Sequence, residues 1–360
     1  MSKEKFRYSM IYNDIKNDIL NDVYKVGSLL PTEQVLSLKY DVNRSTLRKA
    51  MQMLADEGLI EKCPGKGTIV LSSVPVAPES PKVITNKNIG LFLPKENIIT
   101  EPFYSSLFNI LERDFQKNGC SLIYTTLDAS DNIADKITAL GLSGIVFVSN
   151  VVQKHIEYAV SQKIPCVLVN SYSDKLPSVL SDNRKGAYLA GRYLIEHGHK
   201  TVALLAGVRS YLSNQERTAG FLQAFQEEGL SIPPELILET GSWLYDAAEK
   251  VCLNFFNTYT GEMPTALFAF NDRLATGAIN AICKTGRTVP DDVSVIGYDN
   301  LGYYNIISPR ITTVETHIEA ISESTVMHMI WQVNNGSCLP VKVLTPVEVI
   351  SGETVRSLLC

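Results

Sequence analysis

Two arginines and a serine on one side of a short helix have the chemistry to bind a polyanion. Arg44, Ser45 and Arg48 lie opposite an apolar stripe in the segment 44–57, since residues four apart share a helix face. The planar guanidinium of arginine suits guanine edges and phosphates alike. A Gly-Lys-Gly tip follows at 65–67. The two glycines would let the backbone come close to a duplex, and Lys66 would present one positive charge to its phosphates. The pairing predicts a helix that enters a DNA groove and a wing that steadies it.

The elements around these residues are predicted to form a small α+β domain. Apolar spacing indicates an amphipathic helix over 8–20. A second helix over 33–40 begins after Thr32, and a third over 44–57 begins after Asn43, both good N-cap residues. Asp41 lies at the intervening turn, where its residue type tolerates left-handed backbone. Strands over 59–62 and 68–71 flank the tip, so we expect a winged helix-turn-helix.

The remainder of the chain has the pattern of an α/β receptor. Short apolar strands alternate with helix-period segments, which predicts parallel sheets with helices on both faces; the strands are expected over 89–93, 121–125, 144–149, 165–169, 201–206, 266–269 and 294–298. The pattern restarts near residue 200, which indicates two similar lobes with more than one chain crossing between them. Ligands bind beyond the carboxyl ends of such strands, so facing lobes would enclose a cleft.

These patterns divide the chain into a DNA-binding domain (1–71), a linker (72–87) and a two-lobed domain (88–360), to which the resemblances described below assign effector binding and dimerisation. The linker is expected to be extended because it holds three prolines and little periodicity. Net charge is −5 overall, but residues 1–70 carry 11 Lys and Arg against 9 Asp and Glu. A weakly basic head on an acidic body is compatible with DNA binding.

Composition and motifs argue against other classes of protein. No run of about 18 apolar residues is present, so no membrane span is expected. The N-terminus lacks the apolar core of a signal peptide, which favours a cytoplasmic protein. Seven scattered cysteines and five histidines have no metal-ligand spacing, so neither a disulfide framework nor a metal is expected. Hydrolase, P-loop and metalloprotease motifs are lacking, so we expect no enzyme and no cofactor.

The N-terminal segment 8–70 resembles the GntR-type winged helix-turn-helix. The resemblance rests on Leu-Pro-Thr-Glu at 30–33, Val-Asn-Arg-Ser-Thr-Leu-Arg-Lys-Ala at 42–50, and the runs 57–60 and 65–70 around the wing. By this resemblance the DNA-contacting positions are Arg44, Ser45, Thr46, Arg48, Gly65 and Lys66. Gln34 stands where some members place an arginine on DNA, which makes it a further candidate.

Residues from 88 to about 354 resemble the effector domain of the LacI/GalR family, which is similar to periplasmic sugar-binding proteins. Matching blocks lie at 181–190, 215–221, 264–272 and 289–299, and the combination with the N-terminal segment is similar to that of arabinose repressors. Sugar hydroxyls suit bidentate polar groups, and sugar ring faces suit aromatic side chains. The predicted effector-binding residues are Phe103, Tyr104, Asn150, Asn170, Arg217, Trp243, Asn271 and Asp299. Alternative roles are a helix cap for Asn271, a turn for Asp299 and a core position for Trp243.

The resemblances imply a homodimeric transcriptional regulator, most simply a repressor, that binds a near-palindromic double-stranded operator. The leading effector is a small sugar, with a pentose such as L-arabinose as the first guess. A nucleoside- or purine-responsive regulator of the same architecture is one alternative, and a sugar-binding carrier without DNA activity is another. A sugar-processing enzyme is disfavoured for want of a nucleophile or metal motif. Release from the operator when the sugar binds is the expected direction, although the sequence alone does not fix the sign of regulation.

Overall fold

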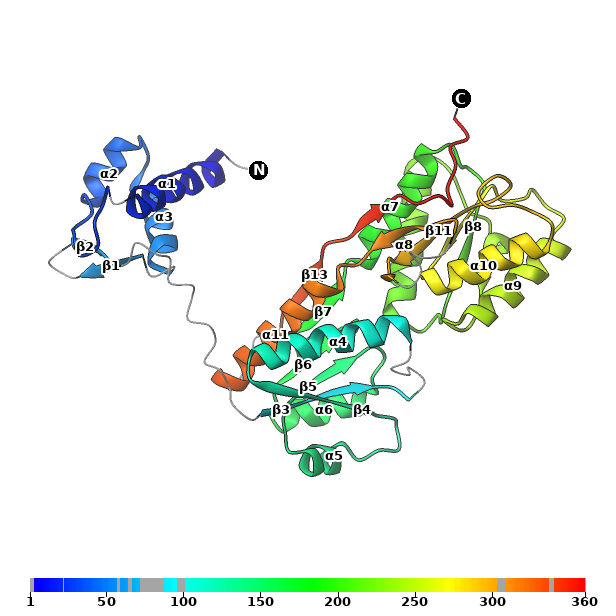
Figure 1. Cartoon of the computed structure of the whole chain (residues 1–360), viewed down its shortest axis with the longest axis horizontal. Helices are drawn as coiled ribbons and strands as arrows, with labels where there is room; N and C mark the ends of the chain where they lie inside the picture. Colours follow the sequence, from blue (N-terminus) through cyan, green and yellow to red (C-terminus); the bar gives the residue numbers. More distant parts are fainter. Residues whose placement is uncertain are drawn as a thin grey trace. The chain divides into compact units, whose positions relative to one another are not determined.

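The computed structural model divides the chain into two compact units, Met1–Val83 and Ile84–Cys360. It describes residues 3–21, 23–56, 59–63, 67–71, 87–95, 101–302, 308–336 and 340–359. Gly65 and Lys66 at the predicted wing tip lie outside the described residues, as does the predicted linker up to residue 86, while Lys87 begins a strand. Figure 1 labels the elements of each unit. Among the described residues, no helix has the length and apolarity to cross a membrane.

The first unit has the helices and the hairpin predicted from its sequence. Its elements are α1 (Lys3–Leu20), α2 (Glu33–Lys39), α3 (Arg44–Asp56), β1 (Ile60–Cys63) and β2 (Gly67–Val70). The two strands pair antiparallel, and Leu29 adds a single bridge to Ile69. The hydroxyl of Thr32 accepts from the Val35 backbone N–H at the start of α2, as an N-cap does.

The turn between α2 and α3 follows from its residues. Asp41 has a left-handed backbone with φ of 49°, as its residue type allows. Asn43 Oδ1 accepts from the Thr46 backbone N–H at 2.8 Å and caps α3. The apolar stripe of α3 is buried against α1, α2 and the hairpin; the fully buried residues include Ile11, Ile15, Ile19, Leu36, Leu47, Ala50 and Leu54. Burial of this stripe turns the polar side of α3 outward.

The second unit contains two six-stranded sheets with matching strand orders. The first is ordered β13-β7-β6-β5-β3-β4 and the second β14-β12-β11-β10-β8-β9. The first comprises β3 (Lys87–Leu93), β4 (Cys120–Thr126), β5 (Leu142–Val148), β6 (Cys166–Val169), β7 (Ser178–Ser181) and β13 (Lys342–Thr345). The second comprises β8 (Val202–Ala206), β9 (Ile237–Glu239), β10 (Ala266–Ala269), β11 (Ser294–Asp299), β12 (Thr312–Glu315) and β14 (Glu348–Ile350). Within the described residues of these two sheets, every strand pair is parallel except β12–β14, which confirms the predicted pair of similar α/β lobes.

Helices cover both faces of each sheet, as parallel sheets require. In the first lobe α4 (Pro102–Lys117) and α11 (Ile318–Asn335) pack together on one face, and α5 (Ile133–Leu140) and α6 (Gln153–Ser161) cover the other. The second lobe pairs α7 (Asn183–Glu196) with α8 (Leu212–Glu227), and α9 (Tyr245–Thr258) with α10 (Asp272–Lys284). The chain passes between the sheets after β7, β12 and β13, so the expected multiple crossings are present.

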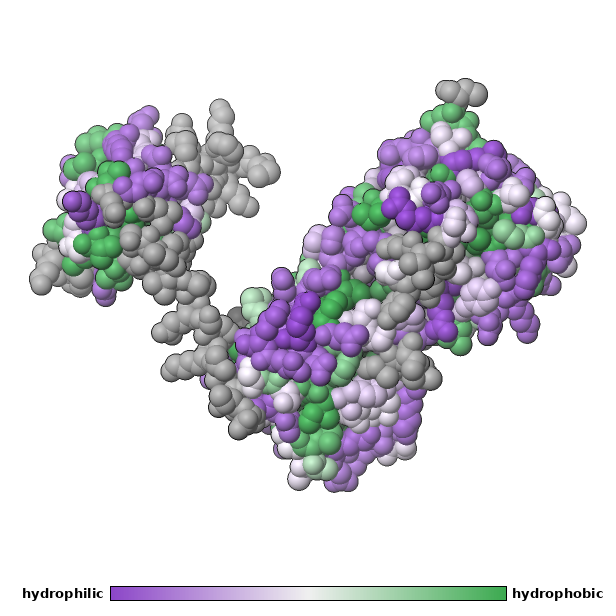
Figure 2. Space-filling view, viewed as in Figure 1, coloured by the Kyte–Doolittle hydropathy of each residue, from purple (hydrophilic) through white to green (hydrophobic). Residues whose placement is uncertain are grey.

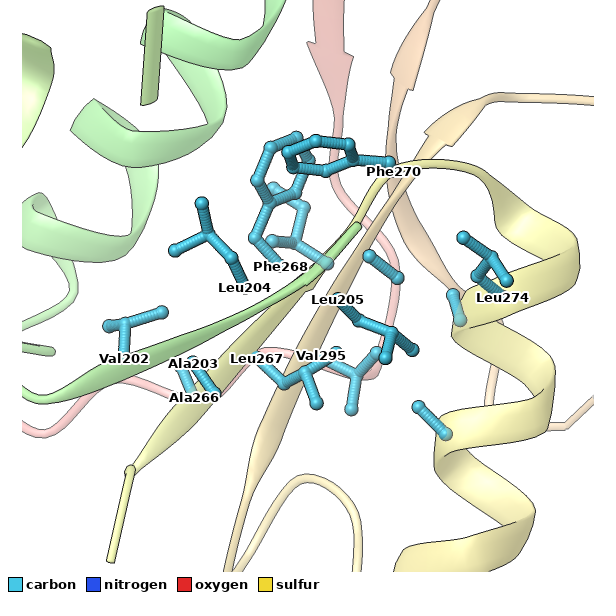
Figure 3. Packing of buried hydrophobic residues seen from close by; sticks show 14 of the residues in the cluster. Val202, Ala203, Leu204, Leu205, Ala266, Leu267, Phe268, Phe270, Leu274 and Val295 are labelled. Atoms are coloured by element: carbon cyan, nitrogen blue, oxygen red, sulfur yellow. The ribbon is translucent and has the colours of Figure 1, made fainter. Parts of the chain in front are cut away.

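In the core of the second lobe, alternating side chains of the strands pack against the helices on the two faces of the sheet. In Figure 3, Val202, Leu204 and Phe268 extend toward the green helices, while Leu267 and Val295 extend toward α10. The Phe268 ring stacks on Phe221 of α8 with centroids 4.7 Å apart. Strand side chains alternate between faces, so both faces of these strands are apolar and buried. In Figure 2 hydrophilic residues predominate on the visible face of the second unit, whereas hydrophilic and hydrophobic residues lie side by side on that of the first.

Candidate functional site

A cleft of about 500 Å³ lies between the two lobes of the second unit. Its walls come from the carboxyl ends of strands in both sheets, where open α/β sheets bind ligands. All eight predicted effector residues line it: Phe103, Tyr104, Asn150, Asn170, Arg217, Trp243, Asn271 and Asp299. Further lining residues were not predicted; they are Glu101, Ser149, Val208, Ser210, Tyr211, Ser213, Gly241, Ser242 and Leu244.

Arg217 lies at the base of the cleft and is held by protein partners. Its guanidinium donates to Asn183 Oδ1 at 2.9 Å, to Asp299 Oδ1 at 3.3 Å and to the backbone carbonyl of Phe270. The Tyr298 ring lies beneath it, with its centre 3.6 Å from Cζ. Both Arg217 and Asp299 are only 7% exposed. The arginine is therefore fixed in one orientation before a ligand arrives.

Two buried aspartates have raised pKa values near the cleft: Asp299, which pairs with this arginine, and Asp272. Burial raises the pKa of Asp299 to about 6, although the positive charge of Arg217 opposes the rise. Burial, and then the charge of Asp299, raise the pKa of Asp272 well above its usual value. Asp272 accepts from the Thr313 hydroxyl at 2.6 Å and from the Leu301 backbone N–H at 3.2 Å. An ionised Asp299 at neutral pH is thus an acceptor held in a poorly hydrated site.

Asn271 has the capping role that was considered for it, and it also lines the cleft. Its Oδ1 accepts from the Leu274 backbone N–H at 2.7 Å at the start of α10. That bond fixes the side chain by its oxygen. Asn271 is nevertheless only partly buried and belongs to the cleft wall, so the cap and a binding role are compatible.

Aromatic side chains from each lobe form opposite walls. Phe103 and Tyr104 of the first lobe make an edge-to-face pair with centroids 5.5 Å apart. Tyr211 and Trp243 of the second lobe make another at 5.8 Å. The Tyr104 hydroxyl lies 2.8 Å from Ser149 Oγ, and burial raises the pKa of this phenol. Such rings suit the apolar faces of a sugar or the plane of a base.

Two buried polar atoms of cleft residues have no protein hydrogen-bond partner in the described part of the chain. They are Asn170 Oδ1, an acceptor, and Trp243 Nε1, a donor. Buried polar groups are normally paired, so unpaired ones need an explanation. Asn170 also has a left-handed backbone with φ of 52°, as do Ser149 at 63° and Asp299 at 103°. Unsatisfied atoms and strained strand ends together are typical of a ligand site.

Ion pairs connect the lobes beside the cleft. Glu101, at the start of α4, pairs with Arg273 of α10. Lys342 of β13 lies 3.4 Å from Glu216 of α8. Each pair has one member in each lobe, so a change in lobe arrangement must alter them.

The polar side of α3 in the first unit presents the predicted DNA-binding residues. Arg44, Ser45 and Arg48 are exposed, and so is Gln34 on α2. Thr46 differs from expectation because it is buried, at 5% exposed. It lies one turn before Ala50 and next to Leu47, so it continues the buried stripe of the helix.

A carboxylate on α2 joins two cations of the first unit. Glu33 accepts from Arg48 Nε at 3.0 Å and from Lys62 Nζ at 2.9 Å. The hydrogen bond from Lys62, followed by that from Arg48, lowers the pKa of Glu33. Both cations remain mostly exposed, with side-chain exposures of 63% and 73%. Glu33 therefore aligns α3 with the hairpin without removing the cations from solvent.

Known proteins resemble both units. Residues 7–70 match the bacterial regulatory proteins of the gntR family, and residues 192–355 match the periplasmic binding protein-like domain family. The chain is 30% identical to the probable HTH-type transcriptional repressor ExuR of Bacillus subtilis (strain 168), over 62% of this chain and 68% of ExuR. It is 29% identical to the HTH-type transcriptional repressor PurR of Pasteurella multocida (strain Pm70), over 71% of this chain and 77% of PurR.

Solved structures share the fold of the second unit. A LacI family transcriptional regulator from Enterococcus faecium with bound ribose has a TM-score of 0.67 and 24% identity, over 76% of this chain and 100% of that chain. The relatives named above are regulators of transcription and not enzymes. The chain therefore belongs to the ligand-responsive, LacI-type transcriptional repressors, and its N-terminal unit is a DNA-binding domain of the gntR family.

Proposed function

We propose that the protein is a homodimeric repressor of carbohydrate-use genes that leaves its operator when a small sugar binds between the lobes. A pentose such as L-arabinose is the first candidate. Residues 1–71 are assigned to operator binding, 72–87 to a linker, and 88–360 to effector binding and dimerisation. Two heads on a dimer match a near-palindromic operator.

The observation that carries this proposal is the convergence of the eight predicted residues on one cleft with walls from both lobes. A ligand that contacts both walls prefers one lobe arrangement, and that preference is what allows it to shift the protein between two states. Coupling of this kind between two sites, here the cleft and the operator-binding surface, typically changes affinity by about 5–150-fold. Asp299 and Asn170 supply acceptors for sugar hydroxyls, and Trp243 supplies an aromatic face.

In the DNA-binding unit we assign base and phosphate contacts to the exposed side of α3 and to the wing. Arg44 and Arg48 project from the first turns of a recognition helix, which usually reach base edges. The remaining proposed contacts are Gln34, Ser45, Thr46, Gly65 and Lys66. The side chain of Thr46 is buried and its backbone N–H donates to Asn43, so we expect it to contribute least among these contacts.

A nucleoside or purine is the second candidate effector. Aromatic residues of both lobes line the cleft, Phe103 on one side and Trp243 on the other, and such rings suit a flat base. The relatives named PurR give this alternative further support.

Binding measurements on the full-length protein test both parts of the proposal. Fluorescence anisotropy with duplexes from the flanking genomic region should detect tight binding that weakens steeply as salt rises, because phosphate contacts release counterions. Calorimetric screening of pentoses, hexoses and nucleosides should then find a ligand that weakens this binding. If the protein binds none of these duplexes, the proposal that it regulates the neighbouring genes is refuted. A nucleoside that releases DNA when no sugar does would select the second candidate.

A further inference from the structure

A smaller cavity of about 210 Å³, which we call the annex, adjoins the effector cleft. Both chambers share wall residues from the two lobes, namely Ser149, Asn150, Asn170, Ser210 and Tyr211. Tyr172 and Gln215 line the annex and not the cleft. The shared wall residues place the two chambers side by side between the lobes.

The annex has the chemistry of a sugar subsite. Serine hydroxyls and the side-chain amides of Asn150, Asn170 and Gln215 can donate to and accept from ring hydroxyls. The unpaired Oδ1 of Asn170 lies in a residue common to both chambers and is an acceptor available to the ligand. Tyr172 is 52% exposed, which is unusual for a large ring, and Lys342 Nζ lies 5.3 Å from its centre. An apolar C–H face packed on this ring would bury it.

The charges around both chambers favour an uncharged occupant. Among the described lining residues the charged ones are Arg217, Asp299 and Glu101. Arg217 and Asp299 pair with each other, and Glu101 pairs with Arg273. Lys342, next to Tyr172, pairs with Glu216. A carboxylate or phosphate on the ligand would have to break one of these pairs to gain a cation.

We propose that the annex binds the second unit of an uncharged glycoside, so that the sugar of the proposed function is bound more tightly as one unit of a disaccharide or similar two-unit sugar than as a free monosaccharide. The inference rests on the proposed sugar response and specifies its ligand class. The sizes are compatible with it, since the cleft of about 500 Å³ and the annex of about 210 Å³ together stay within the range of about 300–1,000 Å³ that is usual for ligand sites.

Calorimetry with matched sugar pairs on the full-length protein tests this inference. The pairs are L-arabinose with arabinobiose, D-xylose with xylobiose, D-glucose with cellobiose, and D-galactose with galactobiose. One disaccharide should bind at least about tenfold more tightly than its monosaccharide. Tyr172→Ala and Gln215→Ala should each reduce that ratio while the affinity for the monosaccharide stays unchanged. Gln226→Ala is the matched control, because Gln226 is exposed on the same helix and lines neither chamber.

The outcomes separate this inference from the function on which it rests. A monosaccharide that binds as tightly as every disaccharide, and still releases DNA, would overturn the annex and leave the sugar response intact. A disaccharide preference that survives both annex substitutions would also overturn it. If no sugar binds although the operator is bound, the sugar response and the annex proposal both fail while the DNA-binding assignment stands. Unchanged thermal unfolding of the variants checks that they are folded.

Discussion

Replacing Arg217 with methionine removes the cation that the cleft holds most tightly. The substitution keeps an apolar stem of similar length against the Tyr298 ring. It removes the donors to Asn183, Asp299 and the Phe270 carbonyl. Asp299 then remains in a site where it is 7% exposed, without its positive partner.

The cost of this change follows from the burial of the pair. Removing one partner of a buried ion pair typically destabilises a protein by about 3–5 kcal/mol, because the other charge stays buried and unpaired. Arg217 lowers the pKa of Asp299, so its loss must raise that pKa above the present value of about 6. A second substitution, Asp299→Asn, removes the unpaired charge. The double variant should therefore lose about 0.5–3 kcal/mol less than the sum of the single variants.

Tryptophan fluorescence during urea unfolding measures these differences in the second unit alone. The chain has two tryptophans, Trp243 and Trp331, and both lie beyond residue 84. The signal is therefore independent of unfolding in the DNA-binding unit, which would otherwise break a two-state treatment. We expect the double variant to bind operator DNA normally and to give no response to effector.

Additive free energies in this cycle, within about 0.5 kcal/mol, would refute the reasoning, since they would mean that the two side chains do not interact. A normal effector response in the double variant would refute the assignment of both residues to the effector site. Arg217→Lys serves as the control, because it keeps the charge while losing the planar fork.

Three further predictions concern other parts of the chain. Arg48→Ala should weaken operator binding in anisotropy assays by about 5- to 150-fold, since a good bidentate base contact is worth about 1–3 kcal/mol, while calorimetric effector affinity is unchanged; loss of both would indicate misfolding. Glu101→Gln breaks the pair with Arg273 between the lobes and should change the ratio of operator affinities with and without effector by up to about fivefold; an unchanged ratio would show that the pair does not favour either state. Effector affinity should fall between pH 7.5 and pH 5 as Asp299, with a pKa of about 6, is protonated, whereas the stability of the second unit gains about 1.4 kcal/mol from this group over the same change; opposite trends would contradict the assigned pKa.

The sign of that stability effect supports the proposed effector-binding role of Asp299. Its pKa in the folded protein is raised above 3.8, so the folded state takes up the proton more readily than the unfolded state. The group therefore destabilises the fold above about pH 6, and the penalty disappears as the pH falls. A carboxylate that costs stability at neutral pH is typical of a binding site.

The sequence predicted the long, strongly patterned elements and missed the short polar ones. The helices of the first unit and the central strands of both lobes have apolar patterns that are visible in their local sequence. Strands β7, β9, β12, β13 and β14 have three or four residues each, and several carry serine, threonine or glutamate. Their extended state comes from pairing with a neighbouring strand, and pairing partners far along the chain leave no local pattern.

The same limit applies to the cleft. Strand-end residues such as Asn170 and Asn271 could be predicted because the carboxyl edge of a parallel sheet is readable from the strand pattern. Tyr211 was missed, although it follows β8 as Phe103 follows β3 in the matching lobe, so the internal repeat would have revealed it. The partners of Arg217 lie 34 to 82 residues away in the chain, and no spacing rule connects them.

The contacts of Asp299 indicate how a ligand bound in the cleft can act on the chain segment that connects the two lobes. Its carboxylate binds Arg217, and its backbone carbonyl accepts from the Thr316 hydroxyl at 3.3 Å, just after β12, where the chain passes to the first lobe. Asp272 holds the Leu301 backbone two residues beyond Asp299. A ligand that reorients Asp299 must therefore shift a segment that connects the lobes, and the closely packed sheets on either side resist gradual deformation. A discrete change of lobe arrangement is the response that such a connection favours, and its differential energy is the source of any change in operator affinity.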